Sequence, residues 1–198
     1  MTCTAVAASA QSSAAKALVG VPSTLVSGLS SSQLADLIDY WEAGLQTHTL
    51  LTPLGDNARL LELTNEVARL ELGPGSFTEL VMLPWKNDTL TAVVTTVETP
   101  ARDSHLTLYD SRWRPVKSGW KEPKLADWAI DKRSRETVEA NVPFMLAEYS
   151  LDPKTGVLTL TRTIDSWLSK DARPDVRPLM FNELKYRWID GKGFVREK

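Results

Sequence analysis

The chain has 198 residues, of which 42 % are apolar, so it is long enough to bury a sizeable hydrophobic core. Charged residues make up 24 % and the formal net charge is -2, which argues against nucleic acid as the main partner, because phosphate-binding surfaces carry a basic excess. One cysteine, Cys3, and two histidines, His48 and His105, leave no disulfide framework, zinc knuckle or CxxC redox pair. We therefore expect no metal site and no cofactor.

The first ten residues differ in composition from the rest of the chain. Residues 1–10 are small and uncharged, and Ala8-Ser9-Ala10 has the small-x-small form of a signal-peptidase site. We interpret them as the remnant of a signal peptide, which predicts an extracytoplasmic protein, periplasmic or associated with the outer membrane. The alternative is a disordered N-terminus of small residues. No apolar run approaches the roughly 20 residues of a transmembrane helix, so no transmembrane span is expected.

Helical periodicity follows in residues 12–46. A short helix is predicted over residues 14–19, with Pro22 ending the run. In the next helix, Ser30 and Gln33 have the spacing of a capping box. Its apolar residues recur at steps of three and four, which is typical of one buried helix face. They are Leu34, Leu37, Ile38, Trp41 and Leu45.

From Ala58 the apolar pattern changes to a period of two. Short alternating segments separated by tight polar turns predict an antiparallel meander over residues 58–113. Residues 114–142 are charged and have little period, so we predict a long connection with one short helix near residues 125–131, which could also link two sub-sheets. A second meander is predicted over residues 143–198, in which Trp188 and Phe194 meet across a hairpin.

These elements together predict a single α+β domain over residues 11–198. Its N-terminal helices would pack on a curved antiparallel β-meander of roughly eight or more strands, because each apolar strand face needs a cover. We expect the sheet to form a half-barrel or a barrel-like structure.

Four stretches of the sequence carry a family resemblance. They are "VPSTLVSGLSSSQLADLIDYWEAGL", "DTLTAVVTTVETPARDSHLTLYDSRWRPV", "LDPKTGVLTLTRTIDSWLSKDARPDVRPLM" and "LKYRWIDGKGF". In this order they span nearly the whole chain after the leader, and the chain resembles the domain-of-unknown-function family numbered three-two-five-six, a family of Bacteroidetes envelope proteins. The resemblance implies a small secreted or lipid-anchored protein with no assigned activity, and it supplies no catalytic residues.

Asp103, Ser104 and His105 stand side by side and are the residue types of a hydrolase triad. Consecutive residues of a strand point to opposite faces, so Ser104 and His105 should diverge. Asp103 fits better as the residue that closes the preceding turn. We therefore interpret the three as structural. The alternative is a hydrolase in which His48, from the loop after the long helix, approaches Ser104.

Four aromatic side chains are the candidate ligand-binding residues. Tyr109 and Trp113 share a face if their strand continues, and they would form either a sugar- or peptide-binding platform or a strip that the helix covers. Trp120 and Trp128 lie in the long connection and would either attach it to the core or face a ligand.

Three functional hypotheses remain, and an enzyme is the less favoured class. The best is a non-enzymatic envelope protein that binds a macromolecular partner or a component of the cell envelope. The second is a hydrolase that uses Ser104 with a histidine or that uses a carboxylate pair. The third is a carrier of a small apolar ligand, which would need an apolar cavity of several hundred Å³ in the cup of the sheet, about the size of most ligand sites.

Overall fold

A computed structural model describes residues 13–197 of the chain, so the predicted signal-peptide remnant at residues 1–10 lies outside the described residues. Two N-terminal helices, α1 (Ser13–Gly20) and α2 (Ser31–Glu42), are joined through the 3-10 turn η1 (Ser23–Leu25). The predicted capping box is present, because the Gln33 backbone N–H donates to the Ser30 hydroxyl and the Ser30 N–H donates to the Gln33 side chain. Leu45 lies beyond the end of α2 and is 54 % exposed, so its predicted place on the buried helix face is wrong.

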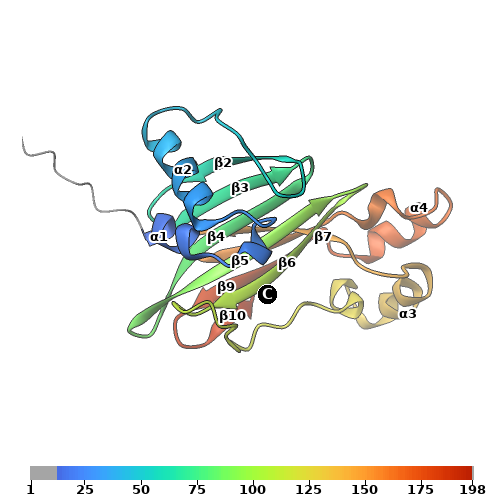
Figure 1. Ribbon diagram of the computed structural model, residues 1–198. Coiled ribbons are helices and arrows are strands. Elements are labelled where there is room, and N and C mark those ends of the chain that lie inside the picture. Colours follow the sequence, from blue (N-terminus) through green and yellow to red (C-terminus); the bar gives the residue numbers. More distant parts are fainter. Residues whose placement is uncertain (1–12, 198) are drawn as a thin grey trace, which may run out of the picture.

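The first meander forms a six-stranded antiparallel sheet in which the strands keep their chain order (Figure 1). We call it sheet 1. Its strands are β1 (Leu50–Leu51), β2 (Asn57–Leu63), β3 (Val67–Gly73), β4 (Ser76–Trp85), β5 (Asp88–Glu98) and β6 (Arg102–Tyr109). The turn between β3 and β4 uses glycine where the backbone needs a positive φ, at Gly75 (φ 70°), as expected of a tight hairpin.

The second meander forms a separate four-stranded antiparallel sheet, sheet 2, with the order β10-β9-β8-β7. Its strands are β7 (Ala147–Asp152), β8 (Val157–Arg162), β9 (Glu183–Ile189) and β10 (Gly193–Arg196). Trp188 and Phe194 meet across the last hairpin with ring centroids 5.0 Å apart, as predicted. The α+β class and the helix-covered antiparallel sheet are confirmed. The barrel-like closure is wrong, because the strands divide into two sheets that do not close.

Two irregular helical segments lie at the end of the molecule away from α1 and α2 (Figure 1). The long connection contains the 3-10 helix η2 (Leu125–Trp128) and also α3 (Lys132–Asn141), which the sequence analysis did not predict. Asp131 caps α3 by accepting a hydrogen bond from the Ser134 N–H. A second segment, between β8 and β9, contains η3 (Ile164–Ser166), α4 (Ala172–Val176) and η4 (Arg177–Leu179).

A buried guanidinium fastens the second helical segment to sheet 2. The Arg162 side chain is 2 % exposed, and its Nε lies 3.1 Å from Asp165 Oδ1. Its Nη2 donates to Asn182 Oδ1 at 3.0 Å, at the far end of the same segment. Burial lowers the pKa of Arg162, and the Asp165 charge opposes that shift. One side chain thus holds both ends of the insertion, as a buried charge must be paired to be tolerated.

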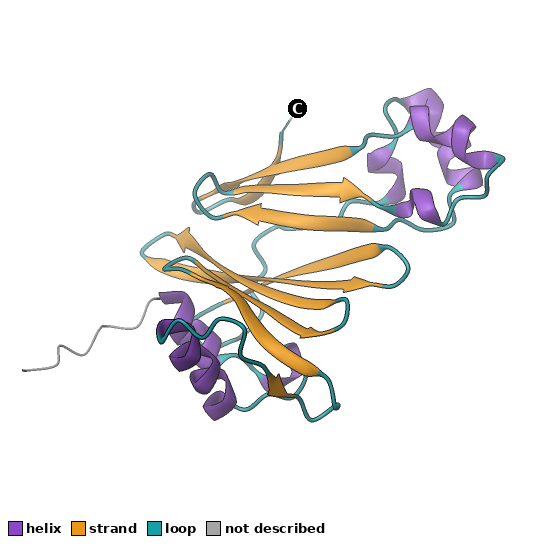
Figure 2. Ribbon diagram, turned by 90° about the horizontal axis from the view of Figure 1, so that it is seen from above, coloured by secondary structure: helices purple, strands orange, loops and turns teal. Residues whose placement is uncertain are grey.

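Sheet 1 is covered on both faces, which gives the molecule two cores in three layers (Figure 2). On one face, residues such as Leu70, Leu80 and Val93 pack under α1 and α2 in the helix-side core. On the other face, residues such as Val81 and Val94 pack against sheet 2 in the inter-sheet core. Alternate residues of β3, β4 and β5 therefore serve different cores, as the period of a strand requires.

Two turns join the sheets at one end of the inter-sheet core. The Trp188 indole of β9 donates from Nε1 to the Pro84 carbonyl oxygen at 2.7 Å, and the ring centroids of Trp188 and Trp85 lie 5.3 Å apart. The Lys86 N–H donates to the Asp190 side chain in the turn that follows β9. These contacts fix how the two sheets align at that end.

Gly193 of β10 is predicted to tolerate no side chain. Its φ is 89°, and a Cβ there would lie well inside contact distance of the Ser118 carbonyl oxygen. Gly191 has a similar φ of 74° with nothing within 4 Å of an added Cβ, so it is the matched control. We expect Gly191→Ala to cost about 1 kcal/mol of unfolding free energy through its backbone alone, and Gly193→Ala to cost at least about 2 kcal/mol more, measured by chemical denaturation. Equal costs at both positions would contradict the close approach.

Candidate functional site

The two sheets meet where β6 and β7 lie close together without forming a ladder. Side chains of β6 take the place of a neighbouring strand. The Tyr149 N–H donates to Ser104 Oγ at 3.1 Å, and the Ala147 N–H donates to Asp103 Oδ1 at 3.4 Å. The Thr163 hydroxyl donates to the Arg102 carbonyl oxygen at 2.6 Å. The edge of β7 is therefore satisfied here by side chains, which leaves sheet 2 free to turn away from sheet 1.

This structural role in the junction of the sheets accounts for Asp103 and Ser104, two of the three triad-like residues. Ser104 is 4 % exposed and its hydroxyl also bonds Thr96 Oγ1 at 2.8 Å. His105 points to the opposite face, with Nδ1 3.7 Å from Glu122 Oε2. His48 stacks on Tyr40 of α2, with ring centroids 3.6 Å apart. Within residues 13–197 no hydrogen bond joins a histidine to a serine hydroxyl, and the alternation of β6 accounts for that.

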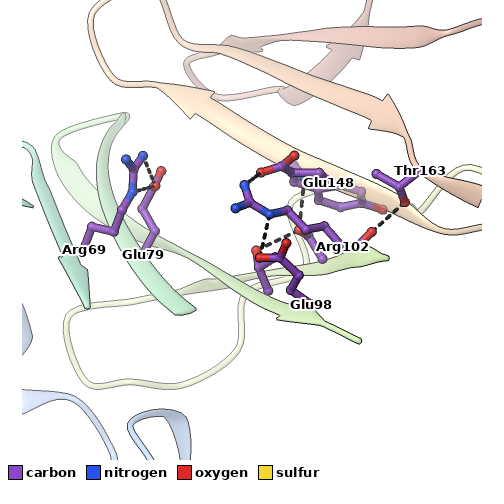
Figure 3. A network of polar contacts seen from close by, with 9 residues as sticks. Arg69, Glu79, Glu98, Arg102, Glu148 and Thr163 are labelled. Carbon is purple, nitrogen blue, oxygen red and sulfur yellow. Dashed lines mark hydrogen bonds and ion pairs between the residues drawn. The ribbon is translucent and has the colours of Figure 1, made fainter. Parts of the chain in front are cut away.

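Beside this junction lies a cleft of about 310 Å³ between the face of sheet 1 and the edge of β7. We call it the inter-sheet cleft. Sheet 1 contributes apolar side chains, one hydroxyl, one carboxylate and two ion-paired arginines, and β7 contributes three successive residues, Glu148, Tyr149 and Ser150. The lining from sheet 1 is Leu61, Arg69, Phe77, Glu79, Val94, Thr96 and Arg102. Figure 3 shows the charged pairs on either side of it.

Arg69 and Glu79 form the first charged pair, from neighbouring positions on β3 and β4. Arg69 Nε donates to Glu79 Oε2 at 2.6 Å, and its Nη1 lies 3.6 Å from Glu62 Oε2. The Glu79 side chain is 12 % exposed. Burial raises the pKa of the Glu79 carboxyl above its ordinary value, and the neighbouring Arg69 charge offsets this only in part. The pair is thus only partly removed from water, because Glu79 is buried and Arg69 is exposed.

Arg102 forms the second charged group and links the two sheets. Its Nη1 donates to Glu148 Oε1 on β7 at 2.5 Å, and its Nε donates to Glu98 Oε2 on β5 at 3.0 Å. These bonds, the one to Glu148 first, raise the pKa of Arg102. The guanidinium also lies 5.8 Å from the centroid of the Phe77 ring, within cation–π range. Arg102 therefore lines the cleft while it is bonded to both sheets.

Tyr149 contributes a buried phenol to the lining of the cleft. Its hydroxyl donates to Glu122 Oε1 at 2.9 Å, which attaches the long connection to β7. Burial, and next the Glu122 charge, raise the pKa of the Tyr149 phenol, so it is neutral throughout the physiological range. The hydrogen bond that it donates to Glu122 fixes the position of the phenol in the lining of the cleft.

The lining of the inter-sheet cleft can hold a ligand by charge, by hydrogen bonds and by apolar contact at the same time. Among residues 13–197, no group of three or more cysteine, histidine or acidic side chains is placed to hold a metal ion. None of the helices in that part of the chain has the length and apolar character to cross a membrane.

The four predicted ligand-binding aromatics lie outside the inter-sheet cleft. Trp128 is 1 % exposed in the inter-sheet core, and Trp120 has its ring centroid 5.2 Å from that of Tyr186, so both attach the long connection to sheet 2. Tyr109 and Trp113 do not share a strand face, because β6 ends at Tyr109. Trp113 lies in the turn that follows, and its own φ is 58°. Their ring centroids lie 5.5 Å apart at the edge of the helix-side core. Ligand binding by these aromatics stays a prediction.

Sequence reasoning missed the charged residues of the cleft. The pairing of Arg69 with Glu79 could have been found by counting back from the Gly73-Pro74-Gly75 turn, which sets them opposite each other on β3 and β4. Nothing in the local sequence links Arg102 to Glu148, which stand 46 positions apart and meet only because the sheets do.

Comparisons with known proteins agree with this architecture. Residues 5–193 match the family model described as "Protein of unknown function (DUF3256)", and the chain belongs to this family. A solved structure of a domain of an uncharacterized protein from Porphyromonas gingivalis W83 is similar in fold, with a TM-score of 0.80 at 20 % identity. The match covers 95 % of this chain and 99 % of that one. No curated protein matches the chain significantly.

Ser104 is predicted to stabilise the junction of the sheets. Ser104→Ala would leave the buried Tyr149 N–H without its acceptor, so we expect a loss of about 1–3 kcal/mol of unfolding free energy. Ser150 is exposed on the neighbouring strand, and Ser150→Ala should change stability by less than about 0.5 kcal/mol. Thermal and urea denaturation would measure both. A Ser104→Ala protein as stable as Ser150→Ala would show that the junction does not depend on this hydroxyl.

Glu79 is predicted to give stability a pH dependence. Because its folded-state pKa is raised above the ordinary value of 4.5, the folded state holds this proton more tightly than the unfolded state. The stability that protonated Glu79 contributes is therefore fully present below pH 4.5, and it is lost as the pH rises through the raised pKa. The unfolding free energy of the wild type should fall relative to that of Glu79→Gln as the pH rises above 4.5, by at most about 1.4 kcal/mol per pH unit, until the carboxyl is ionised in both states. Parallel pH profiles for the two proteins would refute the raised pKa.

Proposed function

We propose that this protein is a non-enzymatic binding protein of the cell envelope, and that its inter-sheet cleft receives an extended segment of a partner protein. The observation that carries the proposal is that the cleft brings charges of both signs and apolar side chains together between the face of sheet 1 and β7, the edge strand of sheet 2. The N–H groups of Ala147 and Tyr149 on that edge are already bonded to β6, so a peptide there would be held mainly by the side chains of the two walls.

The two walls together have the side-chain chemistry that an extended peptide needs. Phe77 and Val94 of sheet 1 offer apolar contact, and Arg69 of sheet 1 and Glu148 of β7 offer charges of opposite sign. Side chains of an extended peptide alternate in direction, so one set can meet the face of sheet 1 while the other meets the side chains of β7. A cleft of about 310 Å³ lies within the usual size of a binding site and would hold a few residues of the partner.

The other two hypotheses fit the geometry less well. A hydrolase centred on Ser104 would need its hydroxyl free, yet that hydroxyl is buried and bonded to Thr96 and the Tyr149 N–H. A carrier of an apolar ligand would need an apolar cavity in the cup of the sheet, yet the inter-sheet cleft is lined by charged side chains, and the inter-sheet core beside it is packed. The proposed extracytoplasmic location rests on the small-x-small motif at residues 8–10 of the sequence.

Photo-crosslinking in the native cells would test the proposal. Phe77 lines the cleft and Phe181 does not, and each lies under an arginine, with centroid distances of 5.8 and 5.6 Å to Arg102 and Arg196, so they are a matched pair. Benzoyl-phenylalanine would replace one or the other. We expect a discrete adduct with a partner protein from position 77 that position 181 does not give.

The same adduct should be lost when Ser150→Trp fills the cleft beside β7. Circular dichroism of each variant would establish that it is folded. No adduct specific to position 77, or an adduct that persists in the filled variant, would overturn the proposal.

A further inference from the structure

A second hollow lies on the helix side of sheet 1, apart from the inter-sheet cleft. It has a volume of about 340 Å³ and is bounded by α1, by the start of β5 and by the turn after β6. We propose that this hollow binds a saccharide, with Trp113 as the aromatic platform on which a sugar ring rests. The proposal does not depend on the inter-sheet cleft, since the two share no lining residue.

The backbone holds Trp113 in a conformation that bulky side chains rarely adopt. Its φ is 58°, in the left-handed region that favours glycine. The Asp110 carboxylate maintains the turn, because Oδ1 accepts from the N–H groups of Arg112 and Arg114 at 2.9 Å each. Asp110 Oδ2 accepts from Arg114 Nε at 2.7 Å. A tryptophan in a strained backbone conformation indicates that its indole ring has a function at that position.

The ring of Trp113 is braced and remains only half-buried. Tyr109 lies beside it, and Gly20 of α1 approaches its indole so closely that an added Cβ would lie 3.3 Å from Nε1. These contacts hold the indole against α1 and Tyr109, and the part of the ring that stays exposed borders the hollow. A rigid, partly exposed aromatic is the feature that a sugar ring can stack on, with its C–H groups against the ring.

Polar groups of both kinds surround that platform. Lys16 of α1 supplies a donor, Asp88 supplies a carboxylate acceptor, and the hydroxyls of Thr89 and Ser111 can do either. No hydrogen bond of the described part of the chain uses the Lys16 ammonium or the Thr89 and Ser111 hydroxyls, and one Asp88 oxygen accepts only from the Thr89 N–H. Sugar hydroxyls donate and accept together, so this mixture around one aromatic ring matches a saccharide better than an apolar or singly charged ligand.

Saturation-transfer NMR with the whole chain would test the site, using maltotriose, cellotriose and chitotriose as probes. We expect at least one of the three to bind at a concentration of about 10 mM or lower, and Trp113→Ala to weaken that binding at least about tenfold. Trp167 is 52 % exposed at the other end of the molecule, so Trp167→Ala is the control and should bind as the wild type does.

Because Trp113 also packs on Tyr109, a second variant keeps the ring and changes only a polar group. Asp88→Ala should weaken binding by about threefold or more while the indole stays in place, which would separate loss of the site from loss of the fold. The proposal is overturned if none of the three trisaccharides binds, if binding survives both Trp113→Ala and Asp88→Ala, or if Trp167→Ala weakens it as much as they do.

Discussion

The structure depends on how two antiparallel sheets meet without sharing a ladder. A strand edge that is brought against protein must have its N–H groups satisfied, because an unpaired buried donor is costly. Here Asp103 and Ser104 of β6 accept from the N–H groups of Ala147 and Tyr149 on β7. The three adjacent residues that resemble a catalytic triad therefore include two that act as substitute strand partners. Their side chains let sheet 2 begin beside sheet 1 and still lie across its face.

The inter-sheet cleft follows from that junction. If β6 and β7 had paired through backbone hydrogen bonds, they would belong to one continuous sheet. That sheet would occupy the position where the Arg102 side chain of β6 now bonds to Glu148. The side-chain junction instead sets the edge of β7 against the face of β3 and β4, where the pair of Arg69 and Glu79 is half removed from water. The proposed peptide site and the stability of the domain thus share the same few contacts.

The sequence was sufficient for most elements of the fold but not for their assembly. The capping box at Ser30, the turn glycines and the period of two predicted the helices and strands, because these signals are local. The period of two cannot say which strands become neighbours, so the division into two sheets stood only as an alternative interpretation of the long connection. Helix α3 was missed because its buried positions are few, namely Ser134 and Val138. Trp113 was placed in a strand because alternation hid the turn that Asp110 forms.

Strands β4 and β5 contribute to both cores, and this has a consequence for how the sequence can vary. Leu80 and Val81 are adjacent, yet one packs under the helices and the other against sheet 2. Deleting a single residue within either strand would exchange the contents of the two cores beyond that point, whereas residues added to the turns would leave every side chain on its own face. A single-residue insertion or deletion within these central strands therefore needs a compensating bulge, whereas a change of two residues keeps every side chain on its own face.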